Sequence, residues 1–340
     1  MKVLRSIEEI KDGINVVLRM DTDLPFEGEK VLDNSRLRKS IPTIRYLLDK
    51  NCKIVVLGHR GRPTGQDPSL SLRPVYVELM SLLESDGQNT IESVFVDDIK
   101  DEQKISLALL NNQIVFVENL RFWAEEDAGD TSLFEVIKKQ VFILVNDAFA
   151  VAHRKNASVI LHREMETYYG FDFVEETEKI GIILENEQRP IVVVLGGAKE
   201  DKMKYLSELT QKADNILIGG KLPKLINPEG INEKILVAKL RDDGLDLSDE
   251  DINTFSEIIN SSNTVIWAGA MGLYESENSR NGTQKIAMAV ANSPGYKIVA
   301  GGDTSASIKD LGLKDKIDFI CSGGGVMLEM LVKGDLPAWN

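Results

Sequence analysis

Short runs of β-branched and other apolar residues alternate along the whole chain with stretches that have helical periodicity. The first half predicts strands at 14–20, 53–58, 93–96, 113–118 and 141–146, and the second half predicts them at 190–196, 215–220, 234–238, 264–269, 297–302 and 318–324. The helical stretches between them are 35–50, 72–85, 130–140, 202–213, 249–261, 281–292 and 325–332. This alternation is typical of parallel sheets that helices cover on both faces. The sequence therefore predicts an α/β fold with two Rossmann-like domains, each a mainly parallel sheet, and ligands at the carboxyl ends of the strands.

One stretch between the two halves has the pattern of a connecting helix. Residues 171–189 place apolar side chains at helical spacing on an acidic background, and Pro190 then opens a new strand. We therefore expect a first domain at 1–170, a hinge helix at 171–189 and a second domain at 190–329. The C-terminal tail, 330–340, is expected to pack back onto the first domain.

Composition narrows the functional classes. The apolar runs are too short to cross a bilayer, and the start MKVLRSIEEI lacks the apolar core of an export signal, so we expect a cytoplasmic protein. Two cysteines and three histidines argue against a disulfide framework and a multi-histidine metal site. The formal net charge of −14 argues against nucleic acid as a partner. Nothing in the sequence demands more than a monomer.

Arginine and glycine are distributed unequally between the two halves. Residues 1–170 hold 11 of the 14 arginines, whereas residues 171–340 hold 18 of the 26 glycines. The guanidinium fork suits carboxylate and phosphate groups, and glycine lets a backbone approach a phosphate closely. The two halves are therefore predicted to bind different ligands.

In the first half, the ends of four predicted strands carry charged or polar side chains. These residues are Asp21 and Asp23, then His59 and Arg62, then Arg121, and finally Arg154, while Arg36 opens a helix. Taken singly, the aspartates could orient hydroxyls or a metal or could cap a turn, and a lone arginine could be solvated surface. Taken together, cations delivered by several strand ends predict a basic pocket suited to a carboxylate plus a phosphate.

In the second half, glycine-rich turns follow five predicted strands. The candidate nucleotide-binding residues in these turns are Gly196, Gly197, Lys199, Lys202, Gly219, Gly220, Glu275, Gly301, Gly302, Asp303 and Thr304. Backbone N–H groups and helix N-termini favour phosphate, although Asp303 could equally be a plain helix cap. A Walker A loop, a kinase HRD loop and a GxSxG elbow are absent from the sequence. Phosphoryl transfer remains possible because it depends mainly on positioning and charge neutralisation.

The ordered motifs resemble those of the phosphoglycerate kinases along nearly the whole chain. The fragments that carry the resemblance are VLRMDTDLP, DNSRLRKSIPTI, GHRGRP, ENLRF, VNDAFAVAHRKNAS, RPIVVVLGGAK, WAGAMGLYE, GGDTSAS and SGGGVMLEML. The resemblance implies a glycolytic transferase that moves a phosphoryl group reversibly between 1,3-bisphosphoglycerate and ADP, giving 3-phosphoglycerate and ATP, with Mg²⁺ accompanying the nucleotide.

The resemblance also implies roles for individual residues. The substrate residues would be Asp21, Asp23, Arg36, His59, Arg62, Arg121 and Arg154. Arg36 and Lys199 would stabilise charge on the transferring group. Lys202, Glu275, Asp303 and Thr304 would serve the nucleotide, with Glu275 on the ribose and Asp303 towards Mg²⁺. Closure of the two domains would bring the ligands together.

Several positions depart from the family pattern. Asp23 stands where the family has asparagine, and Ala268 and Ala270 replace residues of a Trp-Asn-Gly-Pro motif. The second lysine of the GGAK segment comes one residue early, which makes Lys204 an alternative to Lys202, and the stretch 220–262 is short. These departures leave two alternatives open: a homologue that binds phosphoglycerate and nucleotide without transfer, and a kinase for a related carboxylate.

Overall fold

The protein divides into two compact units in the structure, a computed structural model that describes residues 4–85, 91–227 and 231–339. The N-terminal unit runs to Thr177 and includes the segment from Asp335 onward, and the C-terminal unit is Glu178–Gly334. The division falls inside helix α7 (Phe171–Glu185), within the predicted hinge. Of the predicted tail, residue 340 lies outside the described residues, as do 228–230 of the shortened stretch.

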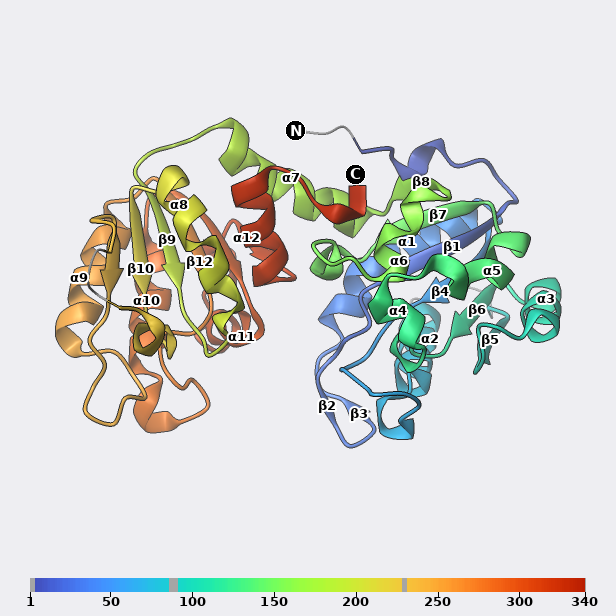
Figure 1. Cartoon of the computed structure of the whole chain (residues 1–340), viewed down its shortest axis with the longest axis horizontal. Helices are drawn as coiled ribbons and strands as arrows, with labels where there is room; N and C mark the ends of the chain where they lie inside the picture. The colour runs from blue at the N-terminus through green and yellow to red at the C-terminus, as the bar shows by residue number, and fades with distance from the viewer. Residues whose placement is uncertain (1–3, 86–90, 228–230, 340) are drawn as a thin grey trace. The chain divides into compact units, whose positions relative to one another are not determined.

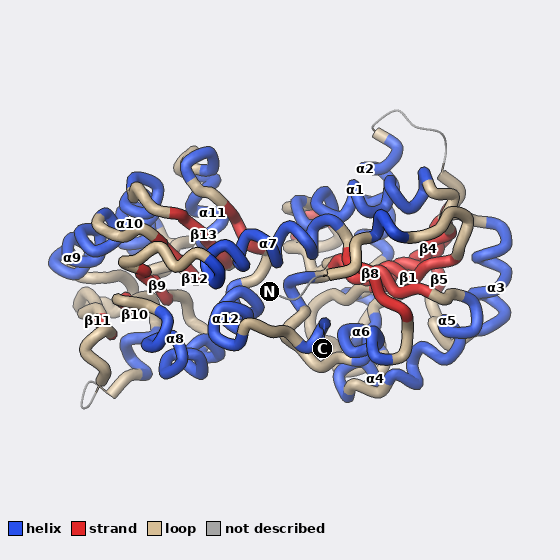
Figure 2. Tube along the Cα trace, turned by 90° about the horizontal axis from the view of Figure 1, so that it is seen from above, coloured by secondary structure: helices blue, strands red, loops and turns tan. Residues whose placement is uncertain are grey.

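The N-terminal unit is built on six parallel strands in the order β5-β6-β4-β1-β7-β8 (Figure 1). The strands are β1 (Asn15–Met20), β4 (Lys53–Leu57), β5 (Ser93–Val96), β6 (Ile114–Val117), β7 (Ile143–Asp147) and β8 (Glu166–Tyr169), and β2 (Phe26–Glu27) pairs with β3 (Lys30–Val31) in a separate hairpin. The helices are α1 (Ser35–Asp49), α2 (Arg73–Glu84), α3 (Glu102–Asn111), α4 (Ala124–Ala128), α5 (Glu135–Gln140) and α6 (Ala157–Ile160). Figure 2 shows helices on both faces of this sheet.

The alternation of side chains along β1 explains why both faces need helices. Val16 and Leu18 point into one apolar core, which contains Leu47 of α1 and Leu79 of α2. Val17 points into a second core on the opposite face, with helix α3. Because successive strand residues face opposite sides, a continuous apolar run such as NVVLRM must be covered twice.

The C-terminal unit has six parallel strands in the order β11-β10-β9-β12-β13-β14. The strands are β9 (Ile191–Leu195), β10 (Asn215–Ile218), β11 (Ile235–Val237), β12 (Thr264–Ala268), β13 (Tyr296–Ala300) and β14 (Phe319–Cys321). The helices are α8 (Leu206–Lys212), α9 (Asp249–Asn260), α10 (Asn281–Asn292), α11 (Gly302–Asp310) and α12 (Gly324–Lys333). This is the strand order of the dinucleotide-binding Rossmann fold, so the predicted α/β fold class is confirmed.

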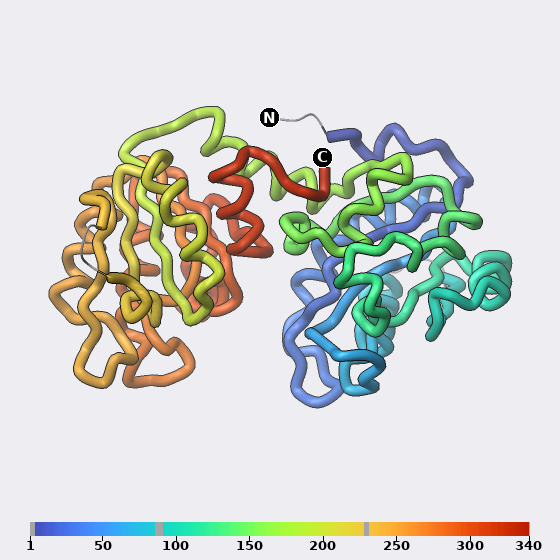
Figure 3. The backbone as a smooth tube through the Cα atoms, in the orientation of Figure 1, coloured from blue at the N-terminus to red at the C-terminus, as the bar shows by residue number. Residues whose placement is uncertain are grey.

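In each sheet, the order in which the strands are connected predicts a ligand crevice beside the first strand. In each unit the chain adds strands first on one side of its first strand and later on the other side, and its course can be followed in Figure 3. The first strand therefore has neighbours reached in opposite directions: β4 and β7 flank β1, while β10 and β12 flank β9. Loops that diverge at such a switch point leave a crevice at the carboxyl ends of the strands. The candidate site residues follow these strand ends.

Of the predicted tail, residues 335–339 belong to the N-terminal unit and pack within it, whereas 330–334 belong to the C-terminal unit, at the end of helix α12. The N–H of Ala338 donates to the carbonyl of Ala152 at 3.1 Å, and the hydroxyl of Tyr169 donates to the carbonyl of Ala338, also at 3.1 Å. The ring of Trp339 lies edge-on to Phe173, with centroids 6.1 Å apart. Within the described residues, no helix is both long enough and apolar enough to cross a membrane.

Three buried carboxyl groups lie where β7 ends and α7 begins. Asp147, Asp172 and Glu176 are at most 7% exposed, and Lys39 Nζ lies 2.8 Å from Glu176 Oε1 and 3.4 Å from Asp172 Oδ1. Burial raises the pKa of Asp147 to about 7. Burial, reinforced by Glu176, raises the pKa of Asp172 to about 8 despite the attraction of Lys39. One ammonium group thus faces more buried carboxyl groups than it can neutralise, and Asp172 is held protonated near neutral pH.

Replacing Asp172 by asparagine is expected to stabilise the fold more at alkaline than at acidic pH. The folded pKa lies above the unfolded value of about 4, so ionising Asp172 costs free energy that is absent below about pH 4 and grows as the pH rises towards 8. We expect Asp172→Asn to raise the free energy of unfolding by about 1–2 kcal/mol at pH 8 and by less at pH 5. Urea unfolding at both pH values measures this difference.

The exposed Glu175, on the same helix, provides the control for that comparison. Glu175→Gln removes the same formal charge and should change stability by no more than about 0.5 kcal/mol at either pH. An Asp172→Asn variant that is less stable than the parent at pH 8 would contradict the interpretation of the buried cluster.

Candidate active site

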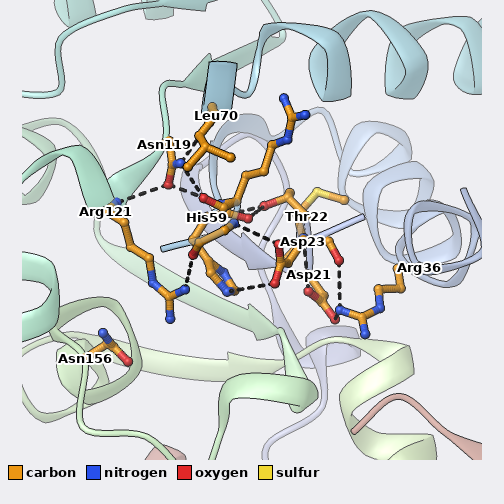
Figure 4. A network of polar contacts seen from close by, with 12 residues as sticks. Asp21, Thr22, Asp23, Arg36, His59, Leu70, Asn119, Arg121 and Asn156 are labelled. Atoms are coloured by element: carbon orange, nitrogen blue, oxygen red, sulfur yellow. Dashed lines mark hydrogen bonds and ion pairs between the residues drawn. The ribbon is translucent and has the colours of Figure 1, made fainter. Parts of the chain in front are cut away.

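Five arginines and one histidine from separate segments of the N-terminal unit gather at the carboxyl edge of its sheet. The members are Arg19 at the end of β1, Arg36 in the first turn of α1, His59 after β4, Arg121 after β6, Arg154 after β7, and Arg62 on the loop that follows β4. We call these six residues the arginine cluster. In Figure 4, Arg36 and Arg121 approach the His59 and Asp23 region from opposite sides. The structure thus brings together the cations that the strand ends predicted.

Burial and mutual repulsion lower the pKa values of cluster members. The pKa of Arg154 is lowered by burial and then by the positive charges of Arg121 and Arg62. Burial, Arg19 and Arg121 hold the pKa of His59 well below its usual value of 6.5. His59 is therefore neutral at physiological pH, while the guanidinium groups remain charged. Such a concentration of positive charge in a partly desolvated place favours an anionic ligand.

Arg19 is a cluster member that the sequence pattern did not single out, because it lies inside the apolar run of β1. Its side chain is 2% exposed. Nε donates to Ser158 Oγ at 3.0 Å, Nη1 donates to the carbonyl of Met20, and Nη2 lies 2.9 Å from His59 Nδ1. A charged residue between the apolar residues Leu18 and Met20 of β1 was the available signal, since arginine is rarely buried without a partner.

The two aspartates after β1 hold the cations in place. Arg36 Nη1 lies 2.9 Å from Asp21 Oδ2 and donates to the carbonyl of Asp23 at 3.1 Å. Asp23 Oδ1 accepts from the N–H of Gly61 at 2.9 Å, so the carboxylate fastens the loop that carries His59 and Arg62. The aspartate at this position therefore fixes local structure in addition to adding a negative charge.

Glu118 and Asn119 support the same edge of the sheet and were not predicted as site residues. Asn119 Oδ1 accepts from the N–H groups of Arg60 and Arg121, each at 3.2 Å. Glu118 Oε1 accepts from the N–H of Leu72 at 2.7 Å. Arg121 also donates through Nη1 to the carbonyl of Gly61. The ENLRF motif thus both supplies an arginine and holds the loop after β4 (Figure 4).

In the C-terminal unit, the glycine turns at the switch point pack against one another. The N–H of Gly197 donates to the carbonyl of Ala270 at 2.7 Å, and the N–H of Gly220 donates to the carbonyl of Met271 at 2.9 Å. The N–H groups of Gly196 and Gly219 donate to strand carbonyls in the same way, at 3.0 and 2.9 Å. The sequence predicted that backbone N–H groups in these turns would be available to phosphate. In the structure, these four donate to protein carbonyls.

Close backbone approach explains why those positions are glycine. A Cβ atom on Gly196 would lie 2.3 Å from the carbonyl oxygen of Ala270. A Cβ atom on Gly269, whose φ is +105°, would lie 2.3 Å from the carbonyl oxygen of Gly196. Real Cβ contacts do not come this close, so any larger residue must displace the neighbouring turn.

The lysines of the 195–204 segment occupy different environments. Lys202 Nζ donates to the carbonyls of Gly196 and Ala268 at 2.8 and 2.9 Å, and burial lowers its pKa to about 8. Lys202 therefore ties the ends of β9 and β12 together. Lys199 is exposed, and the side chain of Lys204 is 59% exposed. Of the three, Lys199 and Lys204 have the exposure that contact with a phosphate requires.

The start of helix α11 is the remaining part of the predicted nucleotide site. Gly302 and Asp303 are exposed in its first turn, whereas Thr304 is fully buried and its Oγ1 accepts from the N–H of Gly269 at 3.0 Å. Glu275 is exposed on the loop after β12. No group of three or more His, Cys, Asp or Glu side chains able to hold a metal occurs among the described residues. A single exposed carboxylate fits Mg²⁺ that is held mainly by nucleotide phosphates.

Together, the fold and these two sites define a two-unit α/β protein with the arginine cluster in one unit and a Rossmann-type sheet in the other. A family model described as phosphoglycerate kinase matches residues 7–239 and 226–334. The two matched segments overlap at 226–239, within the stretch that the sequence identified as short.

Curated relatives and solved structures agree with the family model. The phosphoglycerate kinase of Acidobacterium capsulatum is 32% identical over 382 aligned positions, covering 95% of each protein, and that of Dictyoglomus turgidum is 31% identical, covering 97% of this chain and 95% of the relative. The crystal structure of phosphoglycerate kinase from Pyrococcus horikoshii matches with a TM-score of 0.83 and 25% identity over 98% of this chain and 97% of that one. The Coxiella burnetii structure matches with a TM-score of 0.75 and 25% identity over 99% and 98%. The chain belongs to the phosphoglycerate kinase family.

Proposed function

We propose that this chain transfers a phosphoryl group reversibly between 1,3-bisphosphoglycerate and ADP, giving 3-phosphoglycerate and ATP in glycolysis. The observation that carries the proposal is the arginine cluster, in which five guanidinium groups and a neutral histidine share one edge of the N-terminal sheet. A three-carbon ligand with a carboxylate at one end and a phosphate at the other matches this concentration of planar cations.

The residues proposed to bind phosphoglycerate are those predicted from the sequence, and the buried Arg19 lies behind them. Arg62, Arg121 and Arg154 would neutralise the phosphate, because their charges already repel one another. His59 would donate a hydrogen bond, since it is neutral. Asp21 and Asp23 would orient Arg36, which is one-third exposed and faces the end of the ligand that reacts.

The chemistry requires charge neutralisation rather than a general base. In the direction of ATP synthesis, a β-phosphate oxygen of ADP attacks the phosphorus of the acyl phosphate. The bond from phosphorus to the carboxyl oxygen breaks, and 3-phosphoglycerate leaves as a carboxylate. Both the nucleophile and the leaving group are anions, so no proton needs to move. Arg36 and Lys199 are proposed to stabilise the negative charge on the transferring group, as cations do in other phosphoryl transfers.

The nucleotide is proposed to lie over the glycine turns at the switch point of the C-terminal sheet. Exposed Lys199 and Asp303, at the starts of segments that follow β9 and β13, would face the phosphates, and exposed Glu275 would face the ribose. Mg²⁺, when bound with the nucleotide, would supply charge neutralisation, with Asp303 as its protein ligand. The glycines at 196, 197, 219, 220, 301 and 302 would shape the surface, and Thr304 and Lys202 would keep it rigid.

Transfer also requires the two ligands to meet, so we propose a closing motion through the hinge at 171–189. Small-angle scattering should report a smaller radius of gyration when 3-phosphoglycerate and a non-hydrolysable ATP analogue are both present. An unchanged radius under saturating conditions would contradict closure.

Calorimetry with 3-phosphoglycerate tests the proposed substrate site. Arg154→Ala is expected to weaken binding at least tenfold, because it removes a charge-assisted contact to the phosphate. Arg163→Ala, an exposed arginine outside the cluster, removes the same charge and should leave the affinity within about twofold. Equal effects of the two substitutions would locate the ligand elsewhere.

A further inference from the structure

A buried carboxylate lies behind the arginine cluster and is bound to a single residue. Glu126, in α4, is 1% exposed, and both of its carboxylate oxygens accept from Ser158 of α6. Oε1 accepts from the serine hydroxyl at 2.6 Å, and Oε2 accepts from the serine N–H at 2.9 Å. A hydroxyl has only one proton. Because that proton goes to Glu126, the lone pairs of Ser158 Oγ are left to accept a hydrogen bond from another donor.

Arg19 supplies that donor, through Nε at 3.0 Å. Its Nη1 donates to the carbonyl of Met20, so the plane of the guanidinium is fixed at two points. The negative charge of Glu126 also offsets the cost of burying a guanidinium that is 2% exposed. The remaining nitrogen, Nη2, is thereby aimed at His59 Nδ1, 2.9 Å away.

This contact decides which nitrogen of His59 carries the proton. A guanidinium cannot accept a hydrogen bond, so His59 Nδ1 must be the acceptor and the ring proton must be on Nε2. The carboxylate Oδ2 of Asp23 lies 4.0 Å from Nε2, too far to accept that proton (Figure 4). The Nε2–H group therefore faces the cluster as a neutral donor. The opposite tautomer would present a lone pair, which repels an anionic oxygen.

We propose that Glu126 and Ser158 are positioning residues for the reaction, which act through Arg19 to hold His59 as the Nε2–H tautomer that donates to phosphoglycerate. The inference rests on the proposed binding of phosphoglycerate by the arginine cluster. The path from the carboxylate to the donated proton is Glu126, Ser158, Arg19 and His59. The guanidinium of Arg19 can only donate, which fixes the direction of its hydrogen bonds to Ser158 Oγ and His59 Nδ1.

Whether 3-phosphoglycerate binding weakens or strengthens when Glu126 is neutralised distinguishes positioning of a donor from a change in the electrostatic field. Removing a negative charge beneath a cationic cluster should strengthen anion binding if only the Coulomb field matters. Loss of the positioned Nε2–H donor of His59 should weaken anion binding. Glu126→Gln and Ser158→Ala are therefore both expected to raise the KM for 3-phosphoglycerate about tenfold, with kcat within about threefold, the size of one charge-assisted hydrogen bond.

Asp127 provides the matched control on the same helix. Its carboxylate is 59% exposed and lies 3.5 Å from Arg121 Nε. Asp127→Asn removes the same charge from the same neighbourhood without touching Ser158 or Arg19, so KM should stay the same or fall. A KM that falls or stays constant in Glu126→Gln would overturn the proposal. Should Glu126→Gln not fold, Ser158→Ala decides the question, because it changes no charge.

The tautomer itself can be observed without substrate, in the ¹⁵N–¹H correlation spectrum of the three histidine rings at pH 7.5. The signal of His59, assigned by its absence in His59→Gln, should show Nδ1 unprotonated and Nε2 protonated in the parent protein. Ser158→Ala should show a mixture of tautomers. A proton on Nδ1 in the parent, or an unchanged tautomer in Ser158→Ala, would overturn the inference. Because this readout needs no turnover, it holds even if the chain proves unable to transfer a phosphoryl group.

Discussion

Replacing Arg36 by alanine is expected to lower kcat for phosphoryl transfer by about a thousandfold while the fold stays intact. The guanidinium is held by Asp21 Oδ2 at 2.9 Å and by the carbonyl of Asp23 at 3.1 Å, and these contacts fix where its charge lies. Cations placed on a transferring phosphoryl group contribute about 10³-fold or more to the rate, because the group carries its charge through the transition state. Steady-state kinetics at saturating substrates measure the loss, and circular dichroism checks the fold.

Arg38 is the control for that experiment. It lies on the same helix, is exposed, and donates through Nε to Asn34 Oδ1 at 3.0 Å. Arg38→Ala removes the same charge and should leave kcat within about twofold, because salt screens the field of a solvent-exposed charge. Near-normal kcat in Arg36→Ala would show that charge on the transferring group is neutralised by other residues.

Replacing Gly269 by alanine is expected to cost about 3 kcal/mol or more of folding free energy. The new Cβ would lie 2.3 Å from the carbonyl oxygen of Gly196 and 2.4 Å from Lys202 Nζ, in a backbone with a φ of +105°. The clash, the strained φ and the broken hydrogen bonds of Lys202 add together. Urea denaturation of the purified variant, or its failure to accumulate as folded protein, reports the loss.

Gly302 shows what the same substitution should do where space is free. Nothing lies within 4 Å of a Cβ built there, and its backbone is in the first turn of α11. Gly302→Ala should change stability by no more than about 0.5 kcal/mol. If Gly269→Ala were equally mild, the packing of the glycine turns against one another would not be what holds this edge together.

The fold could be predicted from the sequence because the strands of a parallel sheet that is covered on both faces are continuous apolar runs, which are easy to recognise. The runs around Val16 and Val192 need helices on both sides, and the spacing between strands is filled by helical patterns. Strand β8 (Glu166–Tyr169) was missed because it is a short edge strand with one parallel neighbour and a half-exposed start. Such a strand has little apolar signal of its own.

Candidate site residues could be predicted only where the residue type has few alternative structural explanations at that position. Arginine or histidine side chains at the ends of several strands, such as His59 and Arg121, indicated a shared anion site. Each could be incidental by itself, but a separate explanation for every one of them is improbable. Arg19 escaped notice because it lies within an apolar run. The glycines were harder to interpret, since close approach to a phosphate and close approach to another backbone demand the same residue. Only the structure shows that Gly197 and Gly220 donate their N–H groups to protein carbonyls.

The lysines show a further limit of sequence spacing. The segment after β9 places Lys199, Lys202 and Lys204 within six residues, and spacing alone makes each a candidate for phosphate contact. In the structure, the half-buried Lys202 donates to two carbonyls, and the other two lysines lie exposed. The difference depends on how the short 3-10 turn at Glu200–Tyr205 rotates successive side chains, which residue order does not reveal.

Catalysis, beyond the binding of two ligands, is what distinguishes a phosphoryl-transfer enzyme from a binding homologue. The most direct test is the initial rate of ATP formation by the purified protein from 1,3-bisphosphoglycerate and MgADP. The rate is expected to saturate with both substrates and to fall about a thousandfold in Arg36→Ala. An absence of ATP formation, while calorimetry shows that 3-phosphoglycerate and MgADP both bind, would contradict phosphoryl transfer and identify the chain as a binding homologue.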